Sequence, residues 1–178
     1  MPTDTELHKA AHNGDLAKVK QLVEEGEISV NEPGAAERRP LHRAAGGNHV
    51  EVMKYLIEKG APVDQQDKSG RTALHWAAIS GQKEATDILL GKNTDLFKVT
   101  TSGATPFSAA CEGGRVDVVR SLMEKAIAMR RLEEMCNIKD AADKTPFDMA
   151  AAGQHKAVCT LLKELGDPNA QSAACTIS

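Results

Sequence analysis

One segment of this chain recurs four more times, and that repetition restricts the possible folds more than any other feature. The clearest copy is residues 71–90, RTALHWAAISGQKEATDILL. Each copy has an apolar residue, an Ala three positions later and a Leu fifteen positions later. The aligned apolar residues are Leu7, Leu41, Leu74, Phe107 and Phe147, spaced by 34, 33, 33 and 40 residues. A period near 33 residues predicts a solenoid in which each copy stacks on its neighbours, because one copy alone cannot bury its apolar face.

The copies also carry signals for the start of a helix. Thr72, Thr105 and Thr145 stand where a hydroxyl can cap the first free amides of a helix. Pro106 follows its threonine at the first helical position, where a missing N–H has no cost. In the second copy Arg39 replaces the threonine, which we expect to weaken that cap by about 1 kcal/mol. Each copy therefore predicts a short capped helix, a turn and a second apolar helix.

The copies share the sequence pattern T-x-L-H-x-A-A, followed by G-A-x-V-D/N before the next copy. This pattern resembles that of the ankyrin repeat family. Residues 72–78 and 60–64 show the two parts most plainly, and the resemblance covers residues 3–165. It implies an all-α solenoid of stacked helix-turn-helix units with short β-turn fingers. We expect residues 1–4 to be a loosely held lead and residues 166–178, which lack periodicity, to be a flexible tail. The five expected repeats are residues 5–37, 38–70, 71–103, 104–143 and 144–165.

The fourth copy is seven residues longer than the period. Apolar residues in the segment 116–135 keep helical spacing, which predicts one extended helix. Met129, Arg130 and Leu132 make this helix a second candidate surface for partner contact. The alternative is that they pack against the fifth repeat.

Composition narrows the function classes. The 178 residues suit one domain, and a formal net charge of −3 argues against a dedicated nucleic-acid binder. No apolar run is long enough to span a membrane, and the N-terminus lacks the apolar core of a secretion signal. We therefore expect an intracellular protein, cytoplasmic or nuclear. Its four scattered cysteines predict reduced thiols, with Cys111 and Cys159 buried as small apolar groups.

The resemblance implies a concave binding surface, formed by finger tips and the exposed faces of the first helices. The cations near the second and third fingers predict an acidic or carboxylate-rich partner. The alternative is that they are solvated and balanced by Glu32, Glu37 and Asp67. The lone Trp76 favours half-buried packing, whereas Phe97 is an apolar residue at a normally polar tip and is either a partner contact or packing for the next finger. The candidate partner-binding residues are Arg38, Arg43, Lys68, Arg71, Ile79, Phe97, Glu112 and Lys144.

Catalytic and metal chemistry find no support in the sequence. It holds no G-x-S-x-G, phosphate-binding Gly loop or paired CxxC. His8, His42 and His75 recur with the repeat, and the resemblance implies that they are hydrogen-bonding groups rather than metal ligands. We therefore expect a non-catalytic protein–protein interaction module without cofactor or metal. Such a module would be an adaptor, scaffold or regulatory subunit, and a monomer by itself.

The last four residues, Cys175-Thr176-Ile177-Ser178, match the C-a-a-X pattern for prenylation. Thr176 is not aliphatic, and the residues just before Cys175 include no basic side chain. A single lipid gives only marginal, reversible membrane binding. The alternative function is thus that of a prenylated adaptor at a membrane face. The opposing interpretation is that Cys175 matches the pattern by chance and is not modified.

Overall fold

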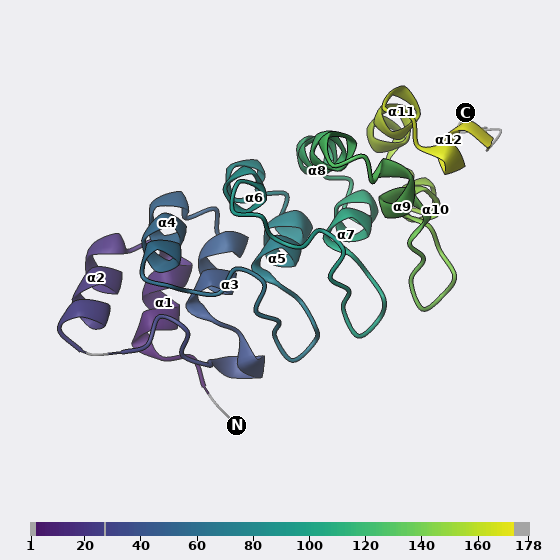
Figure 1. The fold of residues 1–178 in the computed structure, drawn as a ribbon. Coiled ribbons are helices and arrows are strands. Elements are labelled where there is room, and N and C mark those ends of the chain that lie inside the picture. The colour runs from purple at the N-terminus through teal and green to yellow at the C-terminus, as the bar shows by residue number, and fades with distance from the viewer. Residues whose placement is uncertain (1–2, 27, 173–178) are drawn as a thin grey trace.

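The computed structural model describes residues 3–26 and 28–172. All regular elements of this part are helices, and five helix-turn-helix pairs follow one another in chain order (Figure 1). This confirms the predicted all-α solenoid. The first helices of the pairs are α1 (Glu6–Asn13), α3 (Pro40–Gly46), α5 (Ala73–Ser80), α7 (Pro106–Glu112) and α10 (Pro146–Ala152). The second helices are α2 (Leu16–Glu24), α4 (Val50–Glu58), α6 (Lys83–Leu90), α8 (Val116–Ala128) and α11 (Lys156–Glu164). The remaining helices are η1 (Ala35–Glu37), α9 (Leu132–Asn137) and α12 (Pro168–Ser172).

The third pair shows how the local sequence sets the helix ends. The Thr72 hydroxyl accepts from the His75 amide, and the Thr72 amide donates to His75 Nδ1, so both ends of a capping box are made. The helix ends at Gly81, whose φ of 75° is a conformation that glycine adopts without strain. The Arg115 side chain packs where a Cβ on Gly81 would lie. A short first helix and a tight turn follow directly from these residues.

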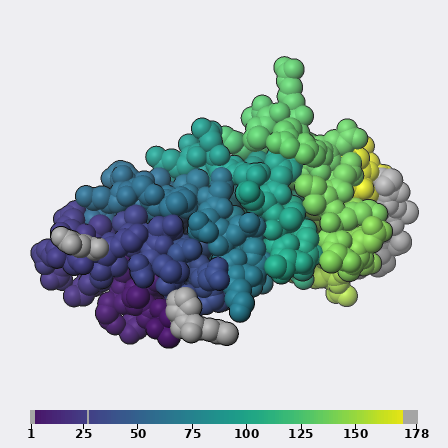
Figure 2. Space-filling model, turned by 60° about the horizontal axis from the view of Figure 1, so that its bottom comes forward, coloured from purple at the N-terminus to yellow at the C-terminus, as the bar shows by residue number. Residues whose placement is uncertain are grey.

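The core lies between neighbouring pairs. All five aligned apolar residues are buried, and each is at most 4% exposed. The leucines fifteen positions later are fully buried in repeats two to five, whereas Leu22 in the terminal repeat is only partly covered. Burying one such side chain stabilises the fold by about 1.5–3 kcal/mol. Figure 2 shows the repeats succeeding one another along the long axis of the molecule.

The segments between pairs form four projecting fingers (Figure 1). Each of these turns is closed by a backbone hydrogen bond, such as Asp67 N–H to Arg71 O at 2.9 Å. Neighbouring fingers are also joined, since Lys68 donates to Ala36 O at 2.9 Å and Thr101 donates to Ser69 O at 3.0 Å. The fingers therefore form a linked row beside the first helices. We refer to the surface made by the fingers and the first helices as the finger face.

The extended helix predicted for the fourth repeat is wrong in its second half. Helix α8 ends at Ala128, and Arg130 adopts φ 57°, which turns the chain into the separate helix α9. This turn brings Met135 and Cys136 into full burial. The apolar spacing continues across the turn because α9 packs one face inward, so spacing alone could not show the break.

The predicted tail also differs in its described part. Residues 168–172 form α12, which packs on α9 and α11. Asp167 accepts the Asn169 amide at 2.8 Å and so starts this helix, and Ala170 is fully buried. The Asn169 side chain donates to Cys136 O at 3.0 Å. The insert of the fourth repeat thus provides the surface on which α12 folds.

Candidate partner-binding face

Three grooves run along the finger face, one after another. The first has a volume of about 140 Å³ and lies between repeats one to three; its lining is His12, Arg38, His42, Arg43, Gly46, Trp76 and Ser80. The second, about 340 Å³, lies between repeats three and four; its lining includes Arg71, Ile79, Ala109, Glu112 and Arg115. The third, about 290 Å³, lies between repeats four and five; its lining includes Glu112, Asp140, Lys144, Asp148 and Met149. Six of the eight candidate binding residues line these grooves.

Two predicted cations lie over the only tryptophan. The guanidinium carbons of Arg38 and Arg71 are 4.5 and 5.2 Å from the centre of the Trp76 ring. The indole N–H donates to Asp67 Oδ2 at 3.1 Å, and the other oxygen of Asp67 accepts the amides of Ser69 and Arg71. Asp67 is 6% exposed, so it acts as an internal fixing point beneath Trp76. Cation–π stacking of this kind contributes about 0.5–2 kcal/mol and orients both guanidinium groups.

The Arg43 guanidinium already forms a salt bridge within the chain, with the Asp4 carboxylate, so only part of it is available to a partner. Burial of Asp4 acts to raise its pKa, but the hydrogen bonds from Arg43 and from the Ala35 amide outweigh it and lower the pKa. The pair ties the residues before α1 to the first groove. Lys68, by contrast, is exposed at its finger tip.

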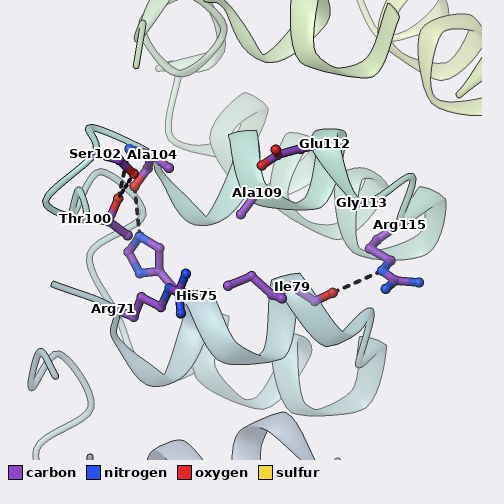
Figure 3. A pocket seen from close by; sticks show the side chains of 10 residues that line it. All are labelled: Arg71, His75, Ile79, Thr100, Ser102, Ala104, Ala109, Glu112, Gly113 and Arg115. Atoms are coloured by element: carbon purple, nitrogen blue, oxygen red, sulfur yellow. Dashed lines mark hydrogen bonds between the residues drawn. The ribbon is translucent and has the colours of Figure 1, made fainter. Parts of the chain in front are cut away.

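Ile79 and Ala109 form the apolar floor of the second groove, between α5 and α7 (Figure 3). His75 lies at one end, where its Nε2 donates to Ala104 O at 3.1 Å. Arg115 lies at the other end and donates to Ile79 O at 3.1 Å. Arg115 is not among the binding residues predicted from the sequence, although the repeat period marks its position. His49, Gln82 and His155 occupy the same position in their repeats and make corresponding hydrogen bonds to the first helix of the preceding repeat.

The third groove is more acidic than the other two. Glu112, Asp140 and Asp148 line it against the single cation Lys144. Burial acts to raise the pKa of Asp148, but hydrogen bonds from the amide and hydroxyl of Thr145 lower it, so the carboxylate stays charged at neutral pH. The positive character of the finger face therefore belongs to its N-terminal half.

The recurring histidines are internal bridges. In His8, His42 and His75, Nδ1 accepts a backbone amide at the helix start, and Nε2 donates to a carbonyl at Arg38, Gln65 and Ala104, respectively. Burial lowers the pKa of His42 and of His75 to about 4, and it also lowers that of His8. Both ring nitrogens are thus used by the fold. In residues 3–26 and 28–172, no cluster of three or more His, Cys, Asp or Glu has the geometry for a metal.

The remaining candidates lie away from the grooves. Phe97 is partly buried, and the Arg131 guanidinium covers its ring at 3.7 Å from the centre. Met129 and Arg130 are exposed at the turn after α8, whereas Leu132 packs against the core. The structure brings none of these residues to the finger face grooves.

The cysteines fall into two groups. Cys111 and Cys159 are buried, as predicted, and so is Cys136; burial raises the pKa of the Cys136 thiol well above its ordinary value. Cys175 and its C-a-a-X sequence lie outside the described residues. Among the helices that are described, none has both the length and the apolar character needed to cross a bilayer.

These features define an α-helical repeat protein whose linked fingers and first helices present a row of open grooves. The chain belongs to the ankyrin repeat family. A family model described as "Ankyrin repeats (3 copies)" matches residues 7–99 and 86–172. Repeats of this family are generally protein–protein interaction modules.

Individual relatives show the same repeats in proteins of different kinds. A putative ankyrin repeat protein of Rickettsia felis is 35% identical over 113 residues, which cover 64% of this chain and 48% of that protein. One from Rickettsia bellii is 33% identical over 124 residues, 68% of each protein. A transient receptor potential cation channel subfamily A member 1 homolog of Caenorhabditis elegans is 25% identical over 187 residues, 90% of this chain but 15% of that protein. The chain thus spans half or less of the first and last of these relatives.

Proposed function

We propose that this chain is a non-catalytic protein-binding module that acts inside the cell as an adaptor, scaffold or regulatory subunit. Its partner binds along the finger face, with an acidic segment over repeats two and three. The observation that carries the proposal is the pair of guanidinium groups, Arg38 and Arg71, held over Trp76 at the edge of open grooves. A face fixed by stacking and hydrogen bonds loses little conformational entropy on binding, which favours affinity.

The test is affinity capture from cell lysate with the wild type and two charge-reversed variants. The finger-face variant carries Arg38→Glu, Lys68→Glu and Arg71→Glu. The matched control carries Lys54→Glu, Lys92→Glu and Arg120→Glu; Lys54 and Arg120 are exposed on second helices, and Lys92 is exposed in the loop after α6. The net charge change is the same in both, and circular dichroism confirms that each variant is folded.

We expect a partner that binds the wild type and the control but not the finger-face variant. A partner retained equally by all three proteins would contradict binding at this face. It would direct attention to the turn at Met129 and Arg130 instead.

A further inference from the structure

We propose that the finger face binds an extended peptide in which an acidic residue and an aliphatic residue are three positions apart. The acidic side chain enters the first groove and the aliphatic side chain enters the second. This inference rests on the proposed function and deepens it by naming the chemistry and spacing of the partner segment.

The first groove offers guanidinium donors that the fold leaves unused. The nearest carboxylate oxygen to Arg38 is Oδ2 of Asp67, 3.8 Å from Nε, which exceeds hydrogen-bonding distance. That Nε is buried without a hydrogen-bond partner, and so is Nε of Arg43. Asp67 cannot easily turn toward Arg38, because Trp76, Ser69 and the Arg71 amide already occupy its oxygens. The Arg38 side chain is 28% exposed although its Nε is buried, so we expect a bound carboxylate to meet the planar guanidinium at its Nη groups, through two parallel hydrogen bonds.

The size of the first groove selects one side chain. Its volume of about 140 Å³ is a few times the ~30 Å³ that a water molecule occupies in the liquid. The groove therefore has room for an Asp or Glu side chain. The Trp76 ring and the backbone at Gly46 line it together with the arginines, so a bound carboxylate is partly shielded from water. Shielding strengthens charge-assisted hydrogen bonds.

The second groove suits an aliphatic side chain. Its floor is Ile79 and Ala109, whereas the polar groups of Arg71 and Glu112 lie toward its edges (Figure 3). Arg71 also lies over Trp76, so the two grooves are adjacent rather than separate sites.

The separation of the grooves sets the residue spacing. Helix α5 forms the ridge between them, with Trp76 and Ser80 on the first groove and His75 and Ile79 on the second. Packed helices lie about 8–10 Å apart, and a peptide extended as a polyproline II helix advances about 3.1 Å per residue with every third side chain on the same side. A peptide that crosses the first helices in this conformation therefore passes from one groove to the next in about three residues, with both side chains facing the grooves. The acidic residue belongs at the first groove, since the carboxylates of Glu112, Asp140 and Asp148 would repel it from the third.

A random twelve-residue peptide library displayed on phage tests this inference without assuming a partner. Selection on the wild-type protein should enrich peptides with Asp or Glu three positions from Leu, Ile or Val. Selection on the Arg38→Lys, Arg71→Lys variant should not enrich them. This variant keeps the net charge but loses the planar forks, so it separates bidentate binding from simple charge attraction. The Lys54→Arg, Lys92→Arg variant is the matched control.

An enriched peptide, chosen without Trp, is then titrated while the fluorescence of Trp76 is followed. Replacing its acidic residue by Asn or Gln, the matching amide, should weaken binding about tenfold or more, and replacing its aliphatic residue by Ala should weaken it about threefold to tenfold. Both changes are in the peptide, so protein folding is unaffected.

Enriched peptides that bind the finger face without an acidic residue would overturn the inference and leave the proposed function intact. Equal affinity for the wild type and the Lys variant would also overturn it, and so would a selection that enriches no peptide. The capture experiment tests the proposed function separately, because it depends on no particular peptide motif.

Discussion

Acidification should destabilise this protein through two buried histidines. In His42 and His75, Nδ1 accepts a backbone amide, so a proton placed there would break the bond that starts the helix. Nε2 is already committed to a carbonyl of the next segment. Burial is the main reason that the pKa of each is lowered to about 4, from 6.5 for the exposed side chain.

The sign follows from proton binding in the two states. Between pH 6.5 and 4 the unfolded chain binds protons on these residues and the folded chain does not. Their contribution to stability is therefore complete above pH 6.5 and is lost as the pH falls toward 4. From pH 7 to pH 5, the free energy of unfolding should fall by about 2 kcal/mol for each histidine, or about 4 kcal/mol together.

The assay is urea unfolding at pH 7, 6 and 5, followed by circular dichroism and by Trp76 fluorescence. A His75→Gln variant should be less stable at pH 7, but its loss between pH 7 and 5 should be smaller than that of the wild type by about 2 kcal/mol. His12→Gln is the control, because His12 is exposed. Identical pH dependence in the wild type and His75→Gln would refute the reasoning.

Three further predictions concern stability. Gly14→Ala should lower the free energy of unfolding by about 1–3 kcal/mol, because Gly14 has φ 73° and a Cβ there would overlap the His49 ring at Nδ1. An unchanged melting temperature would contradict this prediction. Asp167→Asn should stabilise the protein at pH 7, because burial raises the pKa of Asp167 and folding therefore disfavours its charged form. The gain in the free energy of unfolding should disappear when unfolding is measured near pH 3. An equal gain at both pH values would exclude a charge effect. In urea unfolding, Met135→Ala should lower the free energy of unfolding by about 2–5 kcal/mol, whereas Met129→Ala should lower it by under about 0.5 kcal/mol. A similarly small effect of both substitutions would favour a single extended helix in which both side chains are exposed.

The fold could be predicted because the same short sequence pattern occurs five times. The cap at Thr72 and the buried Leu74 each have counterparts one period away, so the aligned residues of the other repeats support the prediction even where one copy departs from the pattern. The insert and α12 occur once and had no such support. Arg130 is the residue that turns the chain between α8 and α9, yet a non-glycine residue with positive φ is uncommon and carries no sequence signal. Burial of Met135 and Ala170 against each other's helices, rather than local preference, determines that region.

The candidate site was predicted in part for a similar reason. The period places Arg38, Arg71 and Ile79 on the fingers and first helices, and the structure finds all three along the grooves. It could not show that both arginines stack on Trp76, since that depends on side chains from different repeats. Nor could it show that Phe97 is covered by Arg131, which comes from the insert.

Acid sensitivity and partner binding should be coupled, because His42 lines the first groove. Burial is the main cause of the lowered pKa of His42, and the nearby positive charges of Arg39 and Arg38 lower it further. A carboxylate bound beside Arg38 would oppose this repulsion and raise the pKa of His42, so by linkage an acidic peptide should bind more tightly as the pH falls toward 5. The measurement is the affinity of the enriched peptide at pH 7 and 5 for the wild type and for His42→Gln. A pH effect that is equal in both proteins would assign the coupling to another group.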